Sequence, residues 1–255
     1  MPSAIVVLLQ TPAPPAGIHL RGWLYHALTP KFPNIHGQSP IRPFSIAFGR
    51  QDKDTSWARF AFLNDEMARY LTNELWQLRG RALKFGNKKT TVIEVFEYGH
   101  PFAGKKNWQK LLDCAPNSDL ALEFITPTLF KKGDLHYPVP VPERILESLI
   151  RHWNAFAPEP ITKSMKDALL QKATFRFLKA YTTTTQAHTL TPGFVGRATL
   201  HLPKATEEEA RWLSRLGELA FFSGVGAKTT IGFGLTRKVA EDEKETRPHP
   251  DGRKN

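Results

Sequence analysis

The feature that most constrains this 255-residue chain is an order of strands and helices that occurs twice. Strand-like runs are apolar or alternate apolar and polar residues, and helix-like runs space their apolar residues by three and four. The first half reads strand, helix, strand, strand, helix, strand, and the second half repeats this order less completely. The segments are 4–10, 18–29, 43–49, 57–63, 64–78 and 90–98, then 120–126, 144–156, 175–183, 196–202 and 206–222. This order predicts an α+β chain of two tandem ferredoxin-like (RRM-like) domains.

The boundary between the two domains is expected at the Cys-Ala-Pro-Asn-Ser turn near residues 115–119. We therefore expect an N-terminal domain over 1–117 and a C-terminal domain over 118–240 that ends with a glycine-rich loop. Residues 241–255 are charged, contain proline and have few apolar residues, which predicts a disordered tail.

Charge is the most informative part of the composition. Lys and Arg number 35 against 24 Asp and Glu, a net charge of +11. Such an excess favours a polyanionic partner, although a surplus that only aids solubility explains it equally well. No apolar run is long enough for a membrane helix, and the apolar N-terminus lacks the basic residues of a secretory signal. A single cysteine, Cys114, and the absence of Cys/His metal spacing predict a cytoplasmic protein without metal or cofactor.

The sharpest local signal is a glycine-rich segment that directly follows the last predicted helix. Glycine permits positive φ and a close approach of backbone N–H groups to an anion, and the Lys and Thr side chains offer further donors to phosphate. The order of elements and the spacing fit neither a Walker loop nor a dinucleotide fingerprint. A glycine helix cap followed by a tight turn is the structural alternative. The residues concerned are Gly224, Gly226, Lys228, Thr229, Thr230, Gly232, Gly234 and Arg237.

This segment also carries a resemblance to a known family. Gly224, Gly226, Gly232, Phe233 and Gly234 form a GxGxxxxxGFG pattern. It resembles the C-terminal signature of the CRISPR-associated repeat-processing endoribonucleases, family six of the CRISPR-associated proteins. The stretches 22–48, 122–154 and 193–202 are similar to that family as well.

The resemblance implies two ferredoxin-like domains and an enzyme of antiviral defence that cuts CRISPR repeat transcripts into guide RNAs. It implies metal-independent cleavage that leaves a 2′,3′-cyclic phosphate and a 5′-hydroxyl. The partners would be precursor and mature guide RNA, with other subunits of a CRISPR effector complex as a further option.

The chemistry of such cleavage selects the candidate catalytic residues. A 2′-hydroxyl attacks the adjacent phosphorus, and the protein moves two protons and stabilises the phosphorane. Histidine suits proton transfer because its pKa is near ~6.5. The family places its histidine in or just after the first helix, which favours His36 and leaves His26 as the alternate. The resemblance also suggests that Tyr25 orients the nucleophile or binds phosphate, and that Arg42 pairs with the scissile phosphate. Two alternatives remain open: Tyr25 could serve only to pack the core, and Arg42 could be an exposed loop residue without a function.

For RNA binding we expect the glycine-rich segment together with the basic pair Lys131 and Lys132 in a predicted hairpin. Two alternatives share the fold: a non-catalytic repeat-RNA-binding protein and a structural subunit of a guide-RNA complex. A small-molecule enzyme that binds phosphate at the glycine-rich segment is a third, which the excess positive charge disfavours.

Overall fold

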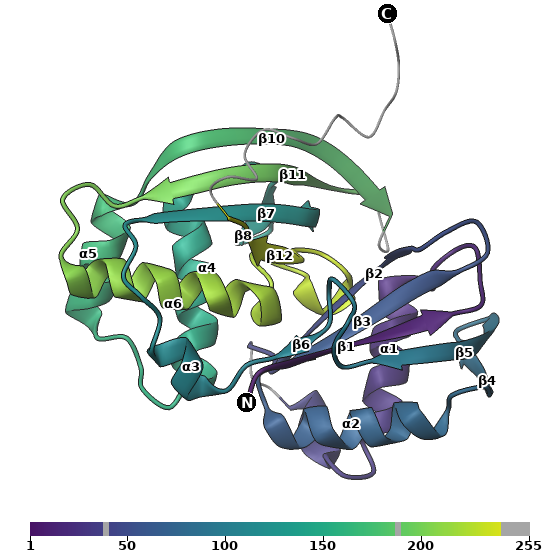
Figure 1. Cartoon of the computed structure of the whole chain (residues 1–255). Helices are drawn as coiled ribbons and strands as arrows, with labels where there is room; N and C mark the ends of the chain where they lie inside the picture. The colour runs from purple at the N-terminus through teal and green to yellow at the C-terminus, as the bar shows by residue number, and fades with distance from the viewer. Residues whose placement is uncertain (38–40, 187–189, 241–255) are drawn as a thin grey trace, which may run out of the picture.

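The computed structural model describes residues 1–37, 41–186 and 190–240 of the chain. Two antiparallel sheets dominate it, and each carries helices on one face (Figure 1). The prediction of an α+β chain is confirmed at the level of antiparallel sheets combined with helices. The predicted tail over 241–255 lies outside the described residues.

The first half forms the larger sheet. Its strands are ordered β2-β3-β1-β5-β4, and a short β6 also pairs with β1. Helices α1 and α2 cover one face, with Leu20, Leu24, Leu71 and Leu75 fully buried against it. Asn64 caps α2 by accepting a hydrogen bond from the Met67 N–H, as its position before the helix predicts. The elements are β1 (Ser3–Leu9), α1 (Gly17–Leu28), η1 (Pro33–His36), β2 (Phe44–Arg50), β3 (Ser56–Phe62), α2 (Asp65–Gln77), β4 (Ala82–Phe85), β5 (Lys88–Phe96) and β6 (Gly104–Lys105).

The second half forms a four-stranded sheet ordered β10-β11-β7-β12, beside a separate two-stranded hairpin of β8 and β9. The longest helix, α6, starts with a capping box between Thr206 and Glu209. The elements are α3 (Trp108–Leu112), β7 (Asp119–Thr128), β8 (Phe130–Lys132), β9 (Leu135–Tyr137), α4 (Pro142–Phe156), α5 (Lys163–Lys172), β10 (Thr174–Gln186), β11 (Leu190–His201), α6 (Glu207–Ser223), η2 (Thr229–Ile231) and β12 (Thr236–Lys238).

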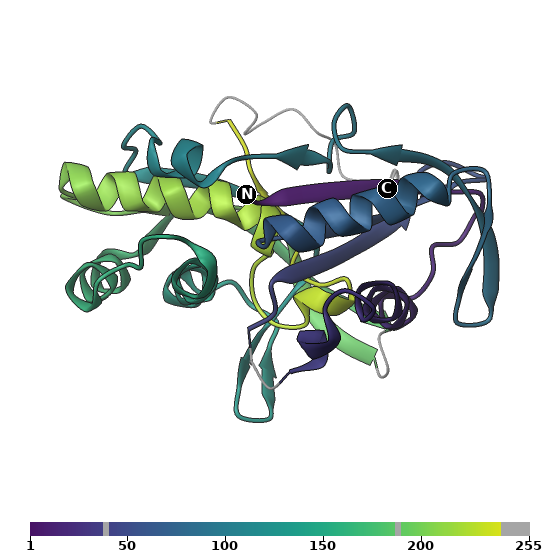
Figure 2. The ribbon, with the colours of Figure 1, turned by 90° about the horizontal axis from the view of Figure 1, so that it is seen from below.

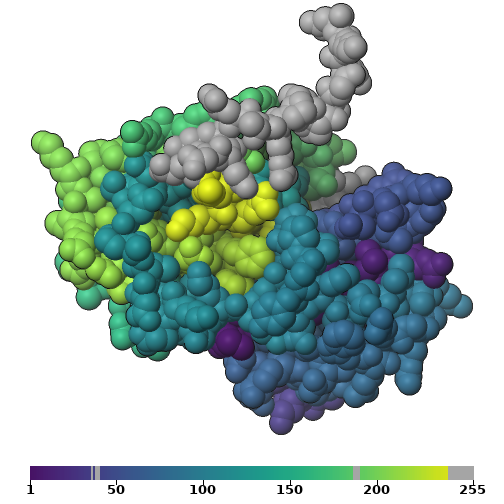
Figure 3. Space-filling view, in the orientation of Figure 1, coloured from purple at the N-terminus to yellow at the C-terminus, as the bar shows by residue number. Residues whose placement is uncertain are grey.

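The two halves meet where the uncovered face of the first sheet packs against the end of α6 and β7. Val6, Ala47, Trp57 and Leu235 form a small buried cluster at this junction. The connecting segment between the halves, coloured teal, lies over the junction in the space-filling view (Figure 3). None of the described helices is long and apolar enough to cross a membrane.

Candidate functional site

The turn that carries His36 is built from one buried anchor and one arginine. Ile35 is 6% exposed and packs into the core of the first half, so η1 is held against α1. Arg42 Nη1 donates hydrogen bonds to the carbonyl oxygens of Ile35 at 3.1 Å and Gly37 at 2.7 Å. The Arg42 guanidinium was expected to face phosphate, but one of its nitrogens bonds to residues 33–37, which are called the His36 turn from here on.

Tyr25 and His26 occupy neighbouring positions on α1 with different surroundings. The ring of Tyr25 is half-buried and lies edge-on to Phe44, with 5.6 Å between ring centroids. His26 is exposed in the last turn of the helix. Phe44 begins the strand that follows the His36 turn, so Tyr25, Arg42 and the turn belong to one corner of the first half.

The glycines of the loop over residues 224–235 (the glycine loop) are required by close backbone contacts. A Cβ at Gly234 would lie 2.1 Å from the Val225 carbonyl oxygen, and a Cβ at Gly226 would lie 2.4 Å from the Leu129 carbonyl oxygen. Both glycines have positive φ, as do Gly224 and Gly232. Gly224 also caps α6, so the structural alternative from the sequence describes part of the loop correctly.

Most N–H groups of the glycine loop are bonded inside the protein. Val225 donates to Gly234, Ala227 donates to Leu129, and Gly234 donates to Pro127. Gly226 donates to the Ser148 hydroxyl at 2.8 Å, and Leu235 donates to the Thr126 hydroxyl at 2.9 Å.

The N–H groups that remain for a ligand gather at the start of η2. The backbone N–H groups of Lys228, Thr229 and Thr230 have no partner among the described residues. Lys228 adopts the left-handed conformation at φ 62°, and its Nζ lies 3.2 Å from the Thr191 hydroxyl oxygen. Consecutive free N–H groups beside an ammonium are suited to a phosphate oxygen.

The start of α1 lies directly against η2. A Cβ at Gly17 would lie 1.9 Å from the Ile231 carbonyl oxygen, so only glycine permits this approach. Helix α1 has no side-chain N-cap, and its first N–H groups add partial positive charge. Beside this contact lies a cavity of about 130 Å³, lined by Ala16, Gly17, Ile18, Phe48, Thr126, Pro127, Thr185, Ile231, Gly232 and Phe233.

The His36 turn and η2 lie at opposite ends of α1. The turn follows the C-terminal end of that helix, whereas η2 meets its N-terminal end. Twelve residues at about 1.5 Å each give a separation of roughly 18 Å. The structure therefore brings Tyr25, Arg42 and the His36 turn together, and sets the glycine loop about one helix length away.

The other predicted RNA-binding residues have separate surroundings. Phe233 is 3% exposed and packs against Leu129 and Ile231, so it belongs to a small core. Arg237 lies in β12, where its Nε donates to the Glu123 carboxylate at 2.7 Å. Burial would raise the pKa of Glu123, but hydrogen bonds and charge from Arg237 and Arg197 outweigh burial and hold that pKa below its usual value.

Lys131 and Lys132 are exposed on the β8–β9 hairpin, which the sequence predicted. Seen from below, the hairpin projects from the same side of the molecule as the glycine loop, η1 and α1 (Figure 2). The lysine pair is therefore open to a ligand on that side.

Sequence reasoning missed a buried arginine that holds the end of α6, from which the glycine loop continues. Arg59 in β3 is fully buried and donates from Nε to the Phe102 carbonyl at 2.9 Å and from Nη2 to the Phe221 carbonyl. Ser45 donates to the Phe222 carbonyl at 2.8 Å. The carbonyls of Phe221 and Phe222 lie at the C-terminal end of α6, where the partial negative charge of the helix stabilises a cation. Burial lowers the pKa of Arg59 to about 9, which leaves it protonated at neutral pH.

Arg59 lies in a strand that reads as alternating and apolar, so the only available signal was a charge inside that run. Among the described residues, no three His, Cys, Asp or Glu side chains are grouped so as to hold a metal ion.

Comparison with known proteins identifies the relatives of this chain. The family model for the CRISPR-associated endoribonuclease Cas6 matches residues 122–236. The curated Cas6 endoribonuclease of Mycobacterium tuberculosis is 23% identical over 229 residues, which are 87% of this chain and 71% of that protein.

Solved structures agree. A Cas6 product complex is 40% identical with a TM-score of 0.88, and covers 94% of this chain and 99% of its own. A Cas6 substrate mimic complex is 39% identical with a TM-score of 0.84, over 93% and 99%. Thermus thermophilus Cas6 is 29% identical with a TM-score of 0.75, over 94% and 98%.

Proposed function

Because this chain belongs to the Cas6 family of CRISPR-associated endoribonucleases, we propose that it binds CRISPR repeat RNA and cleaves it without a metal ion. The observation that carries the proposal is 40% identity to a Cas6 product complex over nearly the whole of both chains. The strand orders β2-β3-β1-β5 and β10-β11-β7-β12 support the two tandem ferredoxin-like domains expected over 1–117 and 118–240.

The proposed chemistry takes place at the His36 turn. A 2′-hydroxyl attacks the adjacent phosphorus, and His36 transfers a proton to or from the reacting oxygens. His26 is the alternate on the exposed end of α1. One similar solved structure is a Cas6 variant with a histidine replaced by alanine, which supports a histidine-centred mechanism.

Tyr25 and Arg42 have different proposed roles. Tyr25 lies beside the turn, and its hydroxyl would orient the nucleophile or the phosphate. Arg42 acts first on the protein, because its Nη1 holds the carbonyl oxygens of Ile35 and Gly37. Its remaining N–H groups would face the scissile phosphate. Such a held geometry is what in-line attack requires.

We assign RNA backbone binding to the N–H groups at the start of η2 with Lys228, Thr229 and Thr230. The N-terminal end of α1 supplies further partial positive charge across the 130 Å³ cavity. A stacked strand rises about 3.4 Å per nucleotide, so the roughly 18 Å length of α1 corresponds to about five nucleotides. The glycine loop therefore grips backbone away from the cut, with Lys131 and Lys132 as further contacts.

The test compares His36→Ala with His26→Ala in single-turnover cleavage of the repeat RNA from the genome that encodes this chain, with EDTA present. His36→Ala should slow cleavage by about 10²–10⁴-fold with little change in affinity, while His26→Ala retains substantial activity. If only His26→Ala is inactive, the catalytic histidine lies on α1. If the wild-type protein binds the repeat but never cuts it, the chain is a non-catalytic repeat-binding subunit.

A further inference from the structure

A second hollow lies on the other side of the glycine loop from α1. It has a volume of about 390 Å³ and is formed by α4, α5, the start of the β8–β9 hairpin and the glycine loop. That volume is within the ~300–1,000 Å³ range of ordinary ligand sites. The lining residues are Phe130, Lys131, Arg144, Glu147, Ser148, Ile150, Arg151, Asn154, Lys166, Gly226 and Ala227.

The hollow carries more positive charge than its neighbours neutralise. Four cations line it, and only one carboxylate, Glu147, lies among them. Glu147 pairs with Arg144 at 2.8 Å, and Lys131 pairs with Asp134 of the hairpin at 3.7 Å. Arg151 and Lys166 make no ion pair with any described residue. Like charges converging on one hollow repel each other unless an anion enters.

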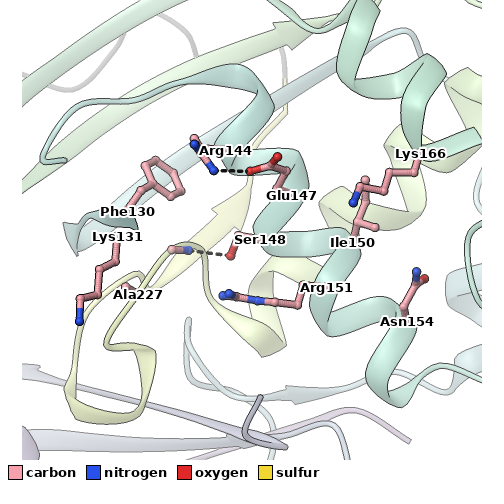
Figure 4. A pocket seen from close by; sticks show the side chains of 11 residues that line it. Phe130, Lys131, Arg144, Glu147, Ser148, Ile150, Arg151, Asn154, Lys166 and Ala227 are labelled. Carbon is pink, nitrogen blue, oxygen red and sulfur yellow. Dashed lines mark hydrogen bonds and ion pairs between the residues drawn. The ribbon is translucent and has the colours of Figure 1, made fainter. Parts of the chain in front are cut away.

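The cations reach the hollow from different elements, and two of them, Arg151 and Lys131, lie beside the glycine loop, whereas Lys166 on α5 lies next to Ile150 (Figure 4). Figure 4 shows Arg151 extending from α4 toward the loop, with Lys131 opposite on the hairpin. The floor between them is fixed, because Gly226 donates to the buried Ser148 hydroxyl at 2.8 Å. The pKa of His136 is lowered first by desolvation and then by the charges of Lys228 and Lys131, so positive charge continues from the hollow to η2.

The glycine loop is a wall shared by both hollows. Gly226 and Ala227 line the hollow beside α4, whereas Ile231, Gly232 and Phe233 line the cavity beside α1. A polyanion that contacts the loop on the α1 side reaches the α4 side by crossing a few residues. A single strand of nucleic acid has the length and regular charge to do this.

We propose that the hollow beside α4 is a second RNA-backbone site, in which Arg151 and Lys166 bind phosphates of the repeat RNA remote from the cut. The site rests on the proposed function and adds to it. The His36 turn lies a helix length beyond the α1 side of the loop, so these phosphates belong to nucleotides more than about five from the scissile bond.

The experiment measures affinity for the repeat RNA from 50 to 200 mM salt with the double variant Arg151→Gln/Lys166→Gln. For single strands, log affinity falls by about 0.7 per log unit of salt for each phosphate contact. Loss of two contacts should therefore flatten the slope by about 1.4 and weaken binding at 0.1 M salt by up to about 25-fold.

The matched control is Lys110→Gln/Lys163→Gln, which removes two exposed helical charges outside the hollow. We expect that control to retain nearly the wild-type slope and affinity. Melting curves of both double variants verify that each is folded.

RNAs shortened one nucleotide at a time from each end locate the contact. Once the remote nucleotides on one side are removed, the wild-type protein and the Arg151/Lys166 variant should bind equally. Equal slopes for that variant and the control on the full repeat would overturn the site. So would an affinity loss that persists on the shortest RNA. Cleavage by the wild-type protein in the same samples reports separately on the proposed function.

Discussion

Arg42→Ala tests whether the His36 turn must be held by its arginine. The substitution removes two hydrogen bonds from a cationic donor to the Ile35 and Gly37 carbonyl oxygens. Such bonds contribute about 1.5–3 kcal/mol each when shielded, and partial exposure reduces this to about 1 kcal/mol each here. About 2 kcal/mol shifts the equilibrium between ordered and open turn by roughly 30-fold.

Two measurements follow from that figure. Single-turnover cleavage at saturating protein should slow by about 10- to 30-fold. Amide hydrogen exchange at Ile35 and Gly37, whose N–H groups bond to Phe32 and Asn34, should accelerate in the RNA-free protein. An arginine that contacts only phosphate would leave exchange in the free protein unchanged. Unchanged exchange would therefore refute the positioning role, whatever happens to the rate.

Three further predictions concern the glycine loop and α4. Gly234→Ala should lower the free energy of unfolding by more than Gly80→Ala, because both have φ near +74° but only Gly234 meets backbone, at 2.1 Å; equal losses on denaturation would contradict this. Lys228→Gln should flatten the salt dependence of RNA binding by about 0.7, and an unchanged slope would remove Lys228 from the interface. Burial lowers the pKa of His152 to about 4. The stability that its neutral form contributes is therefore complete above pH ~6.5, and the free energy of unfolding falls by about 1.4 kcal/mol per pH unit between pH ~6.5 and pH ~4. If denaturant titrations of a His152→Gln variant show the same fall of unfolding free energy with pH as the wild-type protein, this account is wrong.

Elements defined by strong periodicity were predictable from the sequence. The predicted helix over 64–78 is α2, and the predicted strand over 57–63 is β3, each within two residues. Helix α5 was missed because its residues, KSMKDALLQK, have only weak amphipathic spacing. Strand β11 begins six residues before the predicted start, since Pro192 and Gly193 obscure its pattern.

The candidate site was predictable only as a set of residues. The family resemblance suggested His36, Tyr25 and Arg42 as one catalytic set, which stays a prediction, whereas the bonds from Arg42 to backbone carbonyls arise from the fold. The glycine loop was found by its pattern, whereas its free N–H groups depend on contacts with Leu129 and Ser148, about 80 to 100 residues earlier. Long-range bonds of this kind leave no local signal.

The central claim is cleavage by the 2′-hydroxyl next to the scissile phosphate, without metal. It is tested by comparing the repeat RNA with the same RNA carrying a single 2′-deoxy substitution at the nucleotide before the cut, both in EDTA. We predict that the unmodified RNA is cut to a 2′,3′-cyclic phosphate and a 5′-hydroxyl, while the substituted RNA binds equally well and stays intact. Normal cleavage of the 2′-deoxy RNA, or no cleavage of either RNA until a divalent metal is added, would contradict the mechanism.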